Sequence, residues 1–350
     1  MLALTVAPGT ANAARLDEVP EPDPSLGEVL IEARAVGICG TDREIIRGEH
    51  GAPPPGGDRL ILGHESLGRV LEAPAGCGLR RGDWVAGIVR QPDPVPCASC
   101  AHGAWDMCEN GRYVEHGIKE LDGFAVERYR LEPRFAVRID PALAELGVLI
   151  EPASVVAKAW DQIDRIGQRA FWAPRRVLVI GAGPIGLLAA LLGVQRGFEV
   201  HVLDRHTDGP KPQLVADLDA TYHTGTIAEA GRADIILECT GVPSLVIDAM
   251  FAVRPNGIVC LTGVSAAGKR LPVDAGGLNR ELVLENNVVF GSVNANRAHY
   301  DQGAAALQRA DPQWLERLIT RRVPLASWAA ALEQRPDDVK TVLTFDGRMR

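Results

Sequence analysis

Thiol, imidazole and carboxylate side chains occur at three places in the first half of the chain. Cys39 lies in the motif Gly-Ile-Cys-Gly-Thr-Asp, His64 and Glu65 are adjacent in Gly-His-Glu, and Glu151 precedes a proline. These are side chains that bind zinc, and a catalytic zinc ion keeps one coordination position open for water or substrate. Each residue alone has an ordinary explanation, because a single cysteine is usually a small buried hydrophobic side chain. Together they predict a catalytic metal site.

A second group of thiols lies in a short segment further along the chain. Three of the seven cysteines are Cys97, Cys100 and Cys108. In a chain of this size without an export signal, such clustering indicates metal ligands rather than disulfides, and a reducing cytoplasm. A closed tetrahedral zinc site needs four ligands. Either Asp93 or His102 completes such a site, or the three residues are free thiols on an ordered loop.

A Gly-x-Gly-x-x-Gly motif is formed by Gly181, Gly183 and Gly186. A β-branched run precedes it and an Ala/Leu-rich segment follows, which is the order strand, tight turn, helix. The first glycine allows the turn, the second lets the backbone approach a pyrophosphate, and the third lets the helix pack on the strand. The phosphates would lie at the free N–H groups of the helix start. The motif therefore predicts a dinucleotide-binding site.

The next apolar run, 199–203, ends at Asp204. A carboxylate at this place accepts a hydrogen bond from the ribose 2′-hydroxyl, which favours NAD. Arg205 and His206 follow, and an arginine there can pair with a 2′-phosphate. The sequence favours NAD and leaves NADP open, since Arg205 can equally be a solvated surface charge.

The elements that must position these residues change in character near residue 150. Residues 1–150 are rich in Gly and Pro and carry short apolar runs, which predicts a β-rich domain. A helix is expected over 154–166, and strands then alternate with helices, which predicts a doubly wound parallel sheet with covered faces. Helical segments near 299–309 and 312–320 precede a last strand, 341–345, that should rejoin the first domain. The expected strands of the parallel sheet are 176–180, 199–203, 234–238, 257–262 and 287–291.

Composition excludes several classes of protein. The 350 residues are long for one core, so two domains are expected. The net charge of −8 argues against a nucleic-acid partner, which would need a basic patch. No apolar run approaches the roughly 18 residues of a membrane span. Met1–Ala14 lacks the basic start of a signal peptide and is interpreted as a first strand and turn.

The chain resembles the zinc-dependent medium-chain dehydrogenase/reductases, the alcohol dehydrogenase superfamily. The motifs that carry this resemblance are 37–42, 63–68, 181–186 and Glu238-Cys239-Thr240-Gly241, in the family's order. The resemblance implies a GroES-like catalytic domain, 1–153 with 302–350, and a Rossmann domain, 154–301. Thr41 would relay the substrate proton, Cys39 and His64 would bind the catalytic zinc, and Glu65 would lie in or beside its shell. The cofactor would contact Gly181, Gly183, Pro184, Ile185, Gly186, Asp204, Arg205, Thr240, Gly263, Val264 and Val293.

The cysteine segment resembles the structural-zinc lobe of that family. The usual lobe has four cysteines, spaced two, two and seven residues apart. Cys97, Cys100 and Cys108 match the last three places, but the first falls on Pro94, which has no ligand atom. A second, structural zinc ion with Asp93 or His102 as fourth ligand is one expectation, and a metal-free lobe is the other.

Three segments are more similar to the glucose 1-dehydrogenases of this superfamily than to the ethanol-type enzymes: 113–124, 151–159 and 291–297. This narrower resemblance implies that Glu151 serves both zinc and sugar. It also implies that Glu115 and Asn294 hydrogen-bond sugar hydroxyls and that Thr41 touches the sugar. Carboxylates and amides pair well with the hydroxyls of a polyol.

The expected reaction is hydride transfer from C1 of an aldose, most simply D-glucose, to NAD or NADP, giving the aldonolactone. A dehydrogenase of another sugar, a polyol or a secondary alcohol is one alternative. A nucleotide-binding protein without catalytic activity is a remote one, because fold alone does not establish function. The family resemblance also implies a homo-oligomer, a dimer or a tetramer.

Overall fold

The computed structural model describes residues 1–266, 268 and 270–345, and the chain divides into two compact units. The first unit joins Met1–Ser154 to a stretch that begins at Asn294, and the second is Val155–Val293. Residues 294–301, which we expected in the dinucleotide-binding domain, therefore belong to the first unit. The reason is a set of hydrogen bonds, such as that from Asn294 to Glu115. Residues 267, 269 and 346–350 of the expected domains lie outside the described residues.

The first unit is β-rich, as its short apolar runs predict. β3 (Val29–Ile38) is the central strand of its largest sheet and pairs with β5, β10 and β19. Alternate residues of the first half of β3 are buried, which is the period-2 pattern of a strand with one face on a core. The strands of this unit in the described residues are β1 (Leu2–Val6), β2 (Arg15–Glu18), β3, β4 (Leu60–Ile61), β5 (Glu65–Glu72), β6 (Trp84–Gly87), β7 (Arg90–Gln91), β8 (Val114–His116), β9 (Glu120–Leu121), β10 (Arg128–Leu131), β11 (Ala136–Ile139), β18 (Ile319–Pro324) and β19 (Lys340–Thr344).

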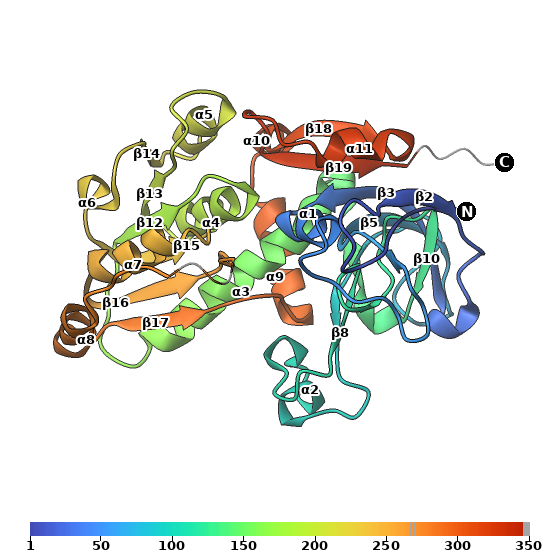
Figure 1. The fold of residues 1–350 in the computed structure, drawn as a ribbon, viewed down its shortest axis with the longest axis horizontal. Coiled ribbons are helices and arrows are strands. Elements are labelled where there is room, and N and C mark those ends of the chain that lie inside the picture. The colour runs from blue at the N-terminus through green and yellow to red at the C-terminus, as the bar shows by residue number, and fades with distance from the viewer. Residues whose placement is uncertain (267, 269, 346–350) are drawn as a thin grey trace. The chain divides into compact units, whose positions relative to one another are not determined.

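Short helices connect these strands. The order in the largest sheet is β11-β6-β5-β3-β19-β18, so the last strand of the chain lies beside β3 (Figure 1). α3 (Ile150–Gly167) begins four residues earlier than the sequence predicts, directly after a 3-10 turn, and runs on into the second unit. The other helices of the first unit are α1 (Gly40–Ile46), α2 (Ala98–Ala101), α9 (Arg297–Gln308), α10 (Pro312–Leu318) and α11 (Trp328–Leu332). Its 3-10 turns are η1 (Pro24–Leu26), η2 (Trp105–Met107), η3 (Pro133–Phe135), η4 (Ala144–Leu149) and η5 (Leu325–Ser327).

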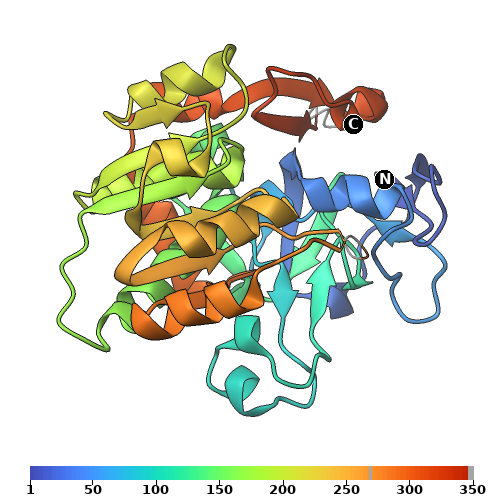
Figure 2. The same cartoon turned by 60° about the vertical axis from the view of Figure 1, so that its left-hand side comes forward.

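The second unit is built on one parallel sheet with the order β14-β13-β12-β15-β16-β17. Numbered along the chain this order is 3-2-1-4-5-6, that of a doubly wound dinucleotide-binding sheet, so the predicted fold class is confirmed. Figure 2 shows these strands with the helices that connect them. The strands are β12 (Arg176–Ile180), β13 (Glu199–Leu203), β14 (Thr221–His223), β15 (Ala233–Glu238), β16 (Val253–Leu261) and β17 (Val288–Gly291). The helices are α4 (Pro184–Gln195), α5 (Pro210–Ala216), α6 (Ile227–Ala230), α7 (Pro243–Ala252) and α8 (Ala275–Leu284).

All five strands that the sequence predicts for this sheet are present, and β14 is an addition. β14 is a three-residue Thr-Tyr-His segment, too short and too polar for an apolar-run criterion to find. Each unit has its own cluster of buried apolar side chains. Among the described residues, no helix combines the length and the apolar character that crossing a bilayer requires.

Candidate active site and cofactor-binding turn

Strand pairing brings the first set of predicted metal ligands together. Cys39 follows β3 and caps α1, while His64 and Glu65 stand at the start of β5. β3 and β5 are antiparallel neighbours in which Gly37 is opposite Glu65. One ligand atom from each of Cys39, His64 and Glu65 lies within 4.8 Å of the other two. The arrangement can hold a metal ion through a thiolate, an imidazole and a carboxylate.

Asp42 orients two of these ligands, a role that the sequence analysis missed. Its Oδ2 accepts a hydrogen bond from the Cys39 backbone N–H at 2.8 Å, and its Oδ1 lies 3.4 Å from His64 Nδ1. Asp42 is only 1% exposed. Burial alone would lower the pKa of His64, but the Asp42 carboxylate and the Cys39 thiol raise it well above its usual range. Because Nδ1 faces the Asp42 carboxylate, Nε2 is the ring nitrogen left for a metal.

Lys340 is a second residue that the sequence analysis missed. Its Nζ contacts both carboxylate oxygens of Glu65 and donates to the Ile38 carbonyl at 3.2 Å. The side chains of Lys340 and Glu65 are each 2% exposed, so this ion pair is fully desolvated. Gly37 makes room for it, because a Cβ there would overlap Glu65 Oε2. No local pattern reveals a partner 275 residues away along the chain.

Glu151 and Thr41 lie at the starts of two helices. Glu151 is in the first turn of α3 and is buried, and its own burial together with the nearby Glu65 carboxylate raises its pKa to about 7. Thr41, in the first turn of α1, is half-buried. A thiol, an imidazole and two carboxylates that share a buried space are costly, and Lys340 supplies only one positive charge there. The donor set therefore fits a zinc ion, with Cys39, His64 and Glu65 or Glu151 as the residues that would hold it.

The two predicted sugar-binding residues are hydrogen-bonded to each other although 179 residues separate them: Asn294 Nδ2 donates to Glu115 Oε1 at 2.7 Å. Both residues are more than nine-tenths buried. Arg90, which the sequence analysis missed, donates to the same oxygen at 3.0 Å and lies 3.7 Å from the centre of the Tyr113 ring. This buried set of donors and acceptors is of the kind that recognises hydroxyl groups.

The glycine turn between β12 and α4 has the geometry that each glycine predicts. Gly181 has φ +101°, a left-handed conformation that favours glycine. A Cβ on Gly183 would meet no atom within 4 Å, so a ligand can approach the backbone there. A Cβ on Gly186 would overlap the Gly181 carbonyl oxygen. Pro184 begins α4, whose first N–H groups, including that of Ile185, have no partner within the helix.

Asp204 lies directly after β13 and is bound to this turn. Its Oδ2 accepts the Ala182 N–H at 2.7 Å, and its Oδ1 accepts from the His206 ring at 2.6 Å. Burial would raise the pKa of Asp204, but these hydrogen bonds lower it to about 2. Lys211 Nζ, 3.4 Å from the same carboxylate, adds a third basic side chain to Arg205 and His206. Arg205 itself is exposed.

The remaining predicted cofactor residues surround the ends of β15, β16 and β17. Thr240 donates its backbone N–H to Glu238 Oε1 at 2.8 Å, and Glu238 is fully buried. A Cβ on Gly263 would overlap the Gly241 backbone, so this approach needs glycine. Val264 and Val293 are 76% and 55% exposed, as apolar side chains at a ligand surface would be.

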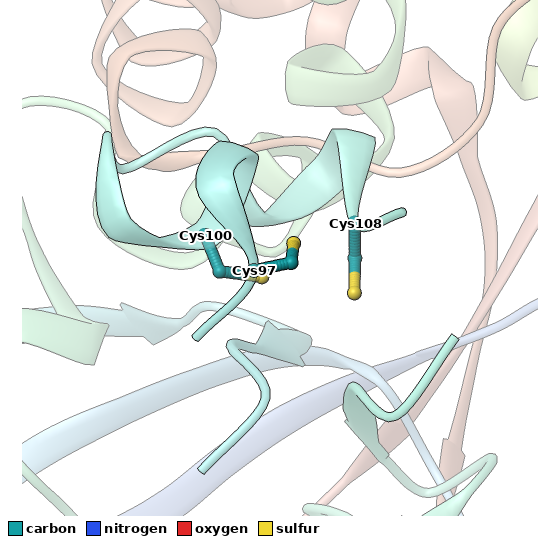
Figure 3. A group of neighbouring side chains, drawn as sticks. All are labelled: Cys97, Cys100 and Cys108. Atoms are coloured by element: carbon teal, nitrogen blue, oxygen red, sulfur yellow. The ribbon is translucent and has the colours of Figure 1, made fainter. Parts of the chain in front are cut away.

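The three thiols of the cysteine segment also meet. Figure 3 shows Cys97, Cys100 and Cys108, whose sulfur atoms lie within 4.8 Å of one another. Asp93, expected as a fourth ligand, does not join them. Its carboxylate accepts the Val95 N–H at 2.9 Å and a hydrogen bond from Asn110, which hold it away from the thiols. His102 does not join them either: its Nδ1 faces the Ala98 carbonyl at 2.7 Å, and neither ring nitrogen belongs to the group of ligand atoms that lie within 4.8 Å of one another.

Comparisons with known proteins agree with this architecture along almost the whole chain. Residues 25–141 match the family model described as alcohol dehydrogenase GroES-like domain, and 144–345 match the one described as glucose dehydrogenase C-terminus. The glucose 1-dehydrogenase of Methanocella arvoryzae is 38% identical over 98% of this chain and 99% of its own length. That of Thermoproteus tenax is also 38% identical, with the same coverage.

A solved structure shows the same fold. The Haloferax mediterranei glucose dehydrogenase, in complex with NADP, Zn and gluconolactone, superposes with a TM-score of 0.92 at 34% identity. The superposition covers 99% of this chain and all of the other. A GroES-like unit with a buried donor cluster, followed by a doubly wound dinucleotide-type sheet, defines the class of zinc-dependent medium-chain dehydrogenases. Within that class, the chain belongs to the glucose dehydrogenase family.

Proposed function

We propose that this chain is a zinc-dependent glucose 1-dehydrogenase, which transfers a hydride from C1 of D-glucose to NAD or NADP and releases the lactone. Relatives named glucose 1-dehydrogenase match it over almost its full length. The observation that carries the proposal is the buried cluster of Arg90, Glu115 and Asn294 in the unit that also holds the metal-ligand set. A simple alcohol has one hydroxyl group, so a buried cluster able to pair with further hydroxyl groups favours a sugar as the substrate.

The residues of the first unit would act as follows. Cys39, His64 and Glu151 or Glu65 would hold zinc, which, when bound, polarises the C1 hydroxyl, while the nicotinamide cofactor accepts the hydride. The Thr41 hydroxyl would accept the proton that the sugar hydroxyl loses and pass it to water. Asp42 keeps the His64 ring in one orientation, and Lys340 neutralises Glu65. Glu115 and Asn294 would bind the remaining hydroxyls and so orient C1.

Substrate specificity tests this function. We expect turnover of glucose, with galactose as the closest competitor, and little turnover of sorbitol, threonine or simple secondary alcohols. A panel of these compounds assayed with NAD and NADP in parallel gives the answer. Preference for a polyol or a secondary alcohol would favour the other dehydrogenase alternative, and nucleotide binding without any turnover would favour a non-catalytic protein.

Glu115→Gln should raise the KM for glucose by about tenfold or more, because a neutral amide accepts weaker hydrogen bonds from sugar hydroxyls than a carboxylate does. The kcat for a simple secondary alcohol should change little, since no hydroxyl depends on residue 115. Steady-state kinetics with both substrates measure the difference. Glu120→Gln, an exposed glutamate near by, is the control. An unchanged KM for glucose would contradict the assigned role.

We also propose that the chain accepts NADP as well as NAD. The Asp204 carboxylate is occupied by hydrogen bonds within the protein, and Arg205, His206 and Lys211 place basic groups around it. Such groups suit a 2′-phosphate. NAD remains usable because the carboxylate can still accept a ribose hydroxyl through a free lone pair.

Arg205→Ala should raise the KM for NADP by at least about tenfold, because a charge-assisted hydrogen bond contributes about 1.5–3 kcal/mol. The KM for NAD should change by less than about threefold, since no phosphate is lost at that place. Initial rates with each cofactor measure the two values. Arg254→Ala, a half-exposed arginine of the same unit, is the control. Equal effects on both cofactors would exclude Arg205 as the phosphate-binding residue.

We propose that the protein is a cytoplasmic homo-oligomer. α8 buries none of its residues, and Val283 and Leu284 are 63% and 59% exposed. β17 is an edge strand of the parallel sheet, with backbone groups free to pair. A second copy of the chain would cover both features. Light scattering of the purified protein measures its molar mass and so tests whether it is an oligomer. The proposed location in the cytoplasm has a different basis: all seven cysteines are free, as a reducing compartment would keep them.

A further inference from the structure

The cysteine segment does not have the ligand set of a closed structural zinc site, although it brings three thiols together. Cys97 caps the N-terminus of α2, Cys100 lies within α2, and Cys108 follows η2. Their sulfur atoms lie within 4.8 Å of one another (Figure 3). A tetrahedral zinc ion with Zn–S distances of about 2.3 Å places its sulfur ligands about 3.8 Å apart, so small movements would complete three of its four bonds.

A hydrogen bond to sulfur and the exposure of the thiols support the interpretation that this cluster can hold a cation. The Glu109 backbone N–H donates to Cys97 Sγ at 3.5 Å. Cys97 and Cys108 are half-buried and Cys100 is buried, so the cluster lies at the boundary between protein and solvent. A cation can therefore enter without unfolding of the segment.

Among the described residues, no further thiol, imidazole or carboxylate atom lies within 4.8 Å of all three sulfur atoms. Pro94 carries no ligand atom. Both Asp93 oxygens already accept hydrogen bonds, from Val95 and from Asn110. Asp93 is 3% exposed, and turning it toward the thiols would break both bonds. The amide of Asn110 holds this arrangement, since its Oδ1 also accepts from Cys108 Sγ at 3.0 Å.

The segment has hydrogen bonds of its own that hold it in place without an ion. Ser99 Oγ donates to Glu109 at 2.6 Å, and Asn296 Nδ2 donates to Asp106 Oδ1 at 2.8 Å. Arg90 donates to the Asp106 carbonyl at 3.2 Å. The first bond closes the segment on itself, and the other two attach Asp106 to the rest of the first unit. A metal ion here can leave or exchange while the segment stays folded.

We propose that Cys97, Cys100 and Cys108 bind one thiophilic divalent cation through three thiolates, with the fourth coordination position open to water or to a small external ligand. The site is thus an exchangeable cation site and not a closed structural one. It exists independently of the substrate and cofactor assigned above.

Cobalt(II) is the probe, because thiolate ligands give it charge-transfer absorption and its visible bands report coordination. The protein is the full chain carrying Cys39→Ala, which removes the thiolate of the other cluster, so that cobalt–thiolate absorption reports this segment. We expect one equivalent of cobalt with thiolate absorption. Adding a monothiol should then shift the visible bands, because it occupies the open position.

Pro94→Cys closes the site in the same background and is the decisive variant, with Pro94→Ser as its control. It should abolish the response to the monothiol. Zinc should leave this variant at least about tenfold more slowly toward a chromogenic chelator, because a fourth thiolate is bound. Pro94→Ser should behave as the parent. Cys108→Ser should lose the cobalt–thiolate absorption, and circular dichroism checks that it is folded.

Two results would overturn the proposal. The first is that the parent shows no cobalt–thiolate absorption, and its three thiols either all react with a thiol reagent or form a disulfide. The segment would then bind no cation. The second is that cobalt binds tightly, its spectrum does not change when the monothiol is added, and zinc is released as slowly as from Pro94→Cys. A protein side chain would then occupy the fourth position. A shifted spectrum together with fast release supports the open site.

Discussion

Cys39→Ala should lower kcat for glucose by about a thousandfold or more. The thiolate is one of the donors that would hold zinc, and Lewis-acid polarisation of a hydroxyl is worth several kcal/mol, with each 1.36 kcal/mol a factor of ten. Cofactor affinity should not change, because the glycine turn and Asp204 lie in the second unit. The measurements are initial rates, zinc content by mass spectrometry, and NADPH binding by fluorescence.

Cys77→Ala is the matched control, since Cys77 is a free, half-buried thiol of the same unit outside both cysteine clusters. It should keep full activity. Near-normal glucose oxidation by Cys39→Ala after chelation of its zinc would refute the metal-dependent mechanism. Loss of activity together with loss of NADPH binding would instead point to misfolding.

Lys340→Met should destabilise the protein by about 3–5 kcal/mol, because it leaves the Glu65 carboxylate buried without its partner. Both side chains are 2% exposed, so water cannot solvate the Glu65 carboxylate once its partner is removed. Glucose turnover should fall as well, since Glu65 would no longer be held beside Cys39 and His64. Urea unfolding gives the change in stability, and kcat measured below the unfolding transition gives the change in activity.

Two comparisons separate the buried pair from a general effect of the substitution. Arg322→Met removes a partly exposed pair with Glu316 and should cost less than about 1 kcal/mol. The double variant Lys340→Met with Glu65→Gln should regain much of the lost stability, because no buried charge is then unpaired. Equal stability of Lys340→Met and the parent would show that the ion pair between Lys340 of β19 and Glu65 of β5 does not stabilise the fold.

Features that depend on neighbours in the chain could be predicted from the sequence. The glycine turn needs a strand, three glycines and a helix in order, and all of these lie within 176–195. The strands of the second unit could be located because parallel strands buried on both faces are nearly continuous apolar runs. β14 was missed because its few polar residues give no such run.

The residue at which the chain returns to the first unit was predicted less accurately. We expected the chain to return to this unit at residue 302, whereas it returns at Asn294. The cause is a set of polar contacts between distant segments, including Asn294 with Glu115 and the Tyr300 hydroxyl with the Val89 N–H at 3.2 Å. Periodicity of apolar residues carries no information on such contacts.

The ligand types were determined by the sequence itself, because a thiol, an imidazole or a carboxylate is a property of one residue. Only the tertiary structure decided which of them meet. It paired β3 with β5, which brought Cys39 to His64, and it placed Lys340 of the last strand against Glu65. It also kept Asp93 away from the three thiols. Chemistry is local to a residue, whereas proximity depends on strand pairing and on buried charges finding partners from anywhere in the chain.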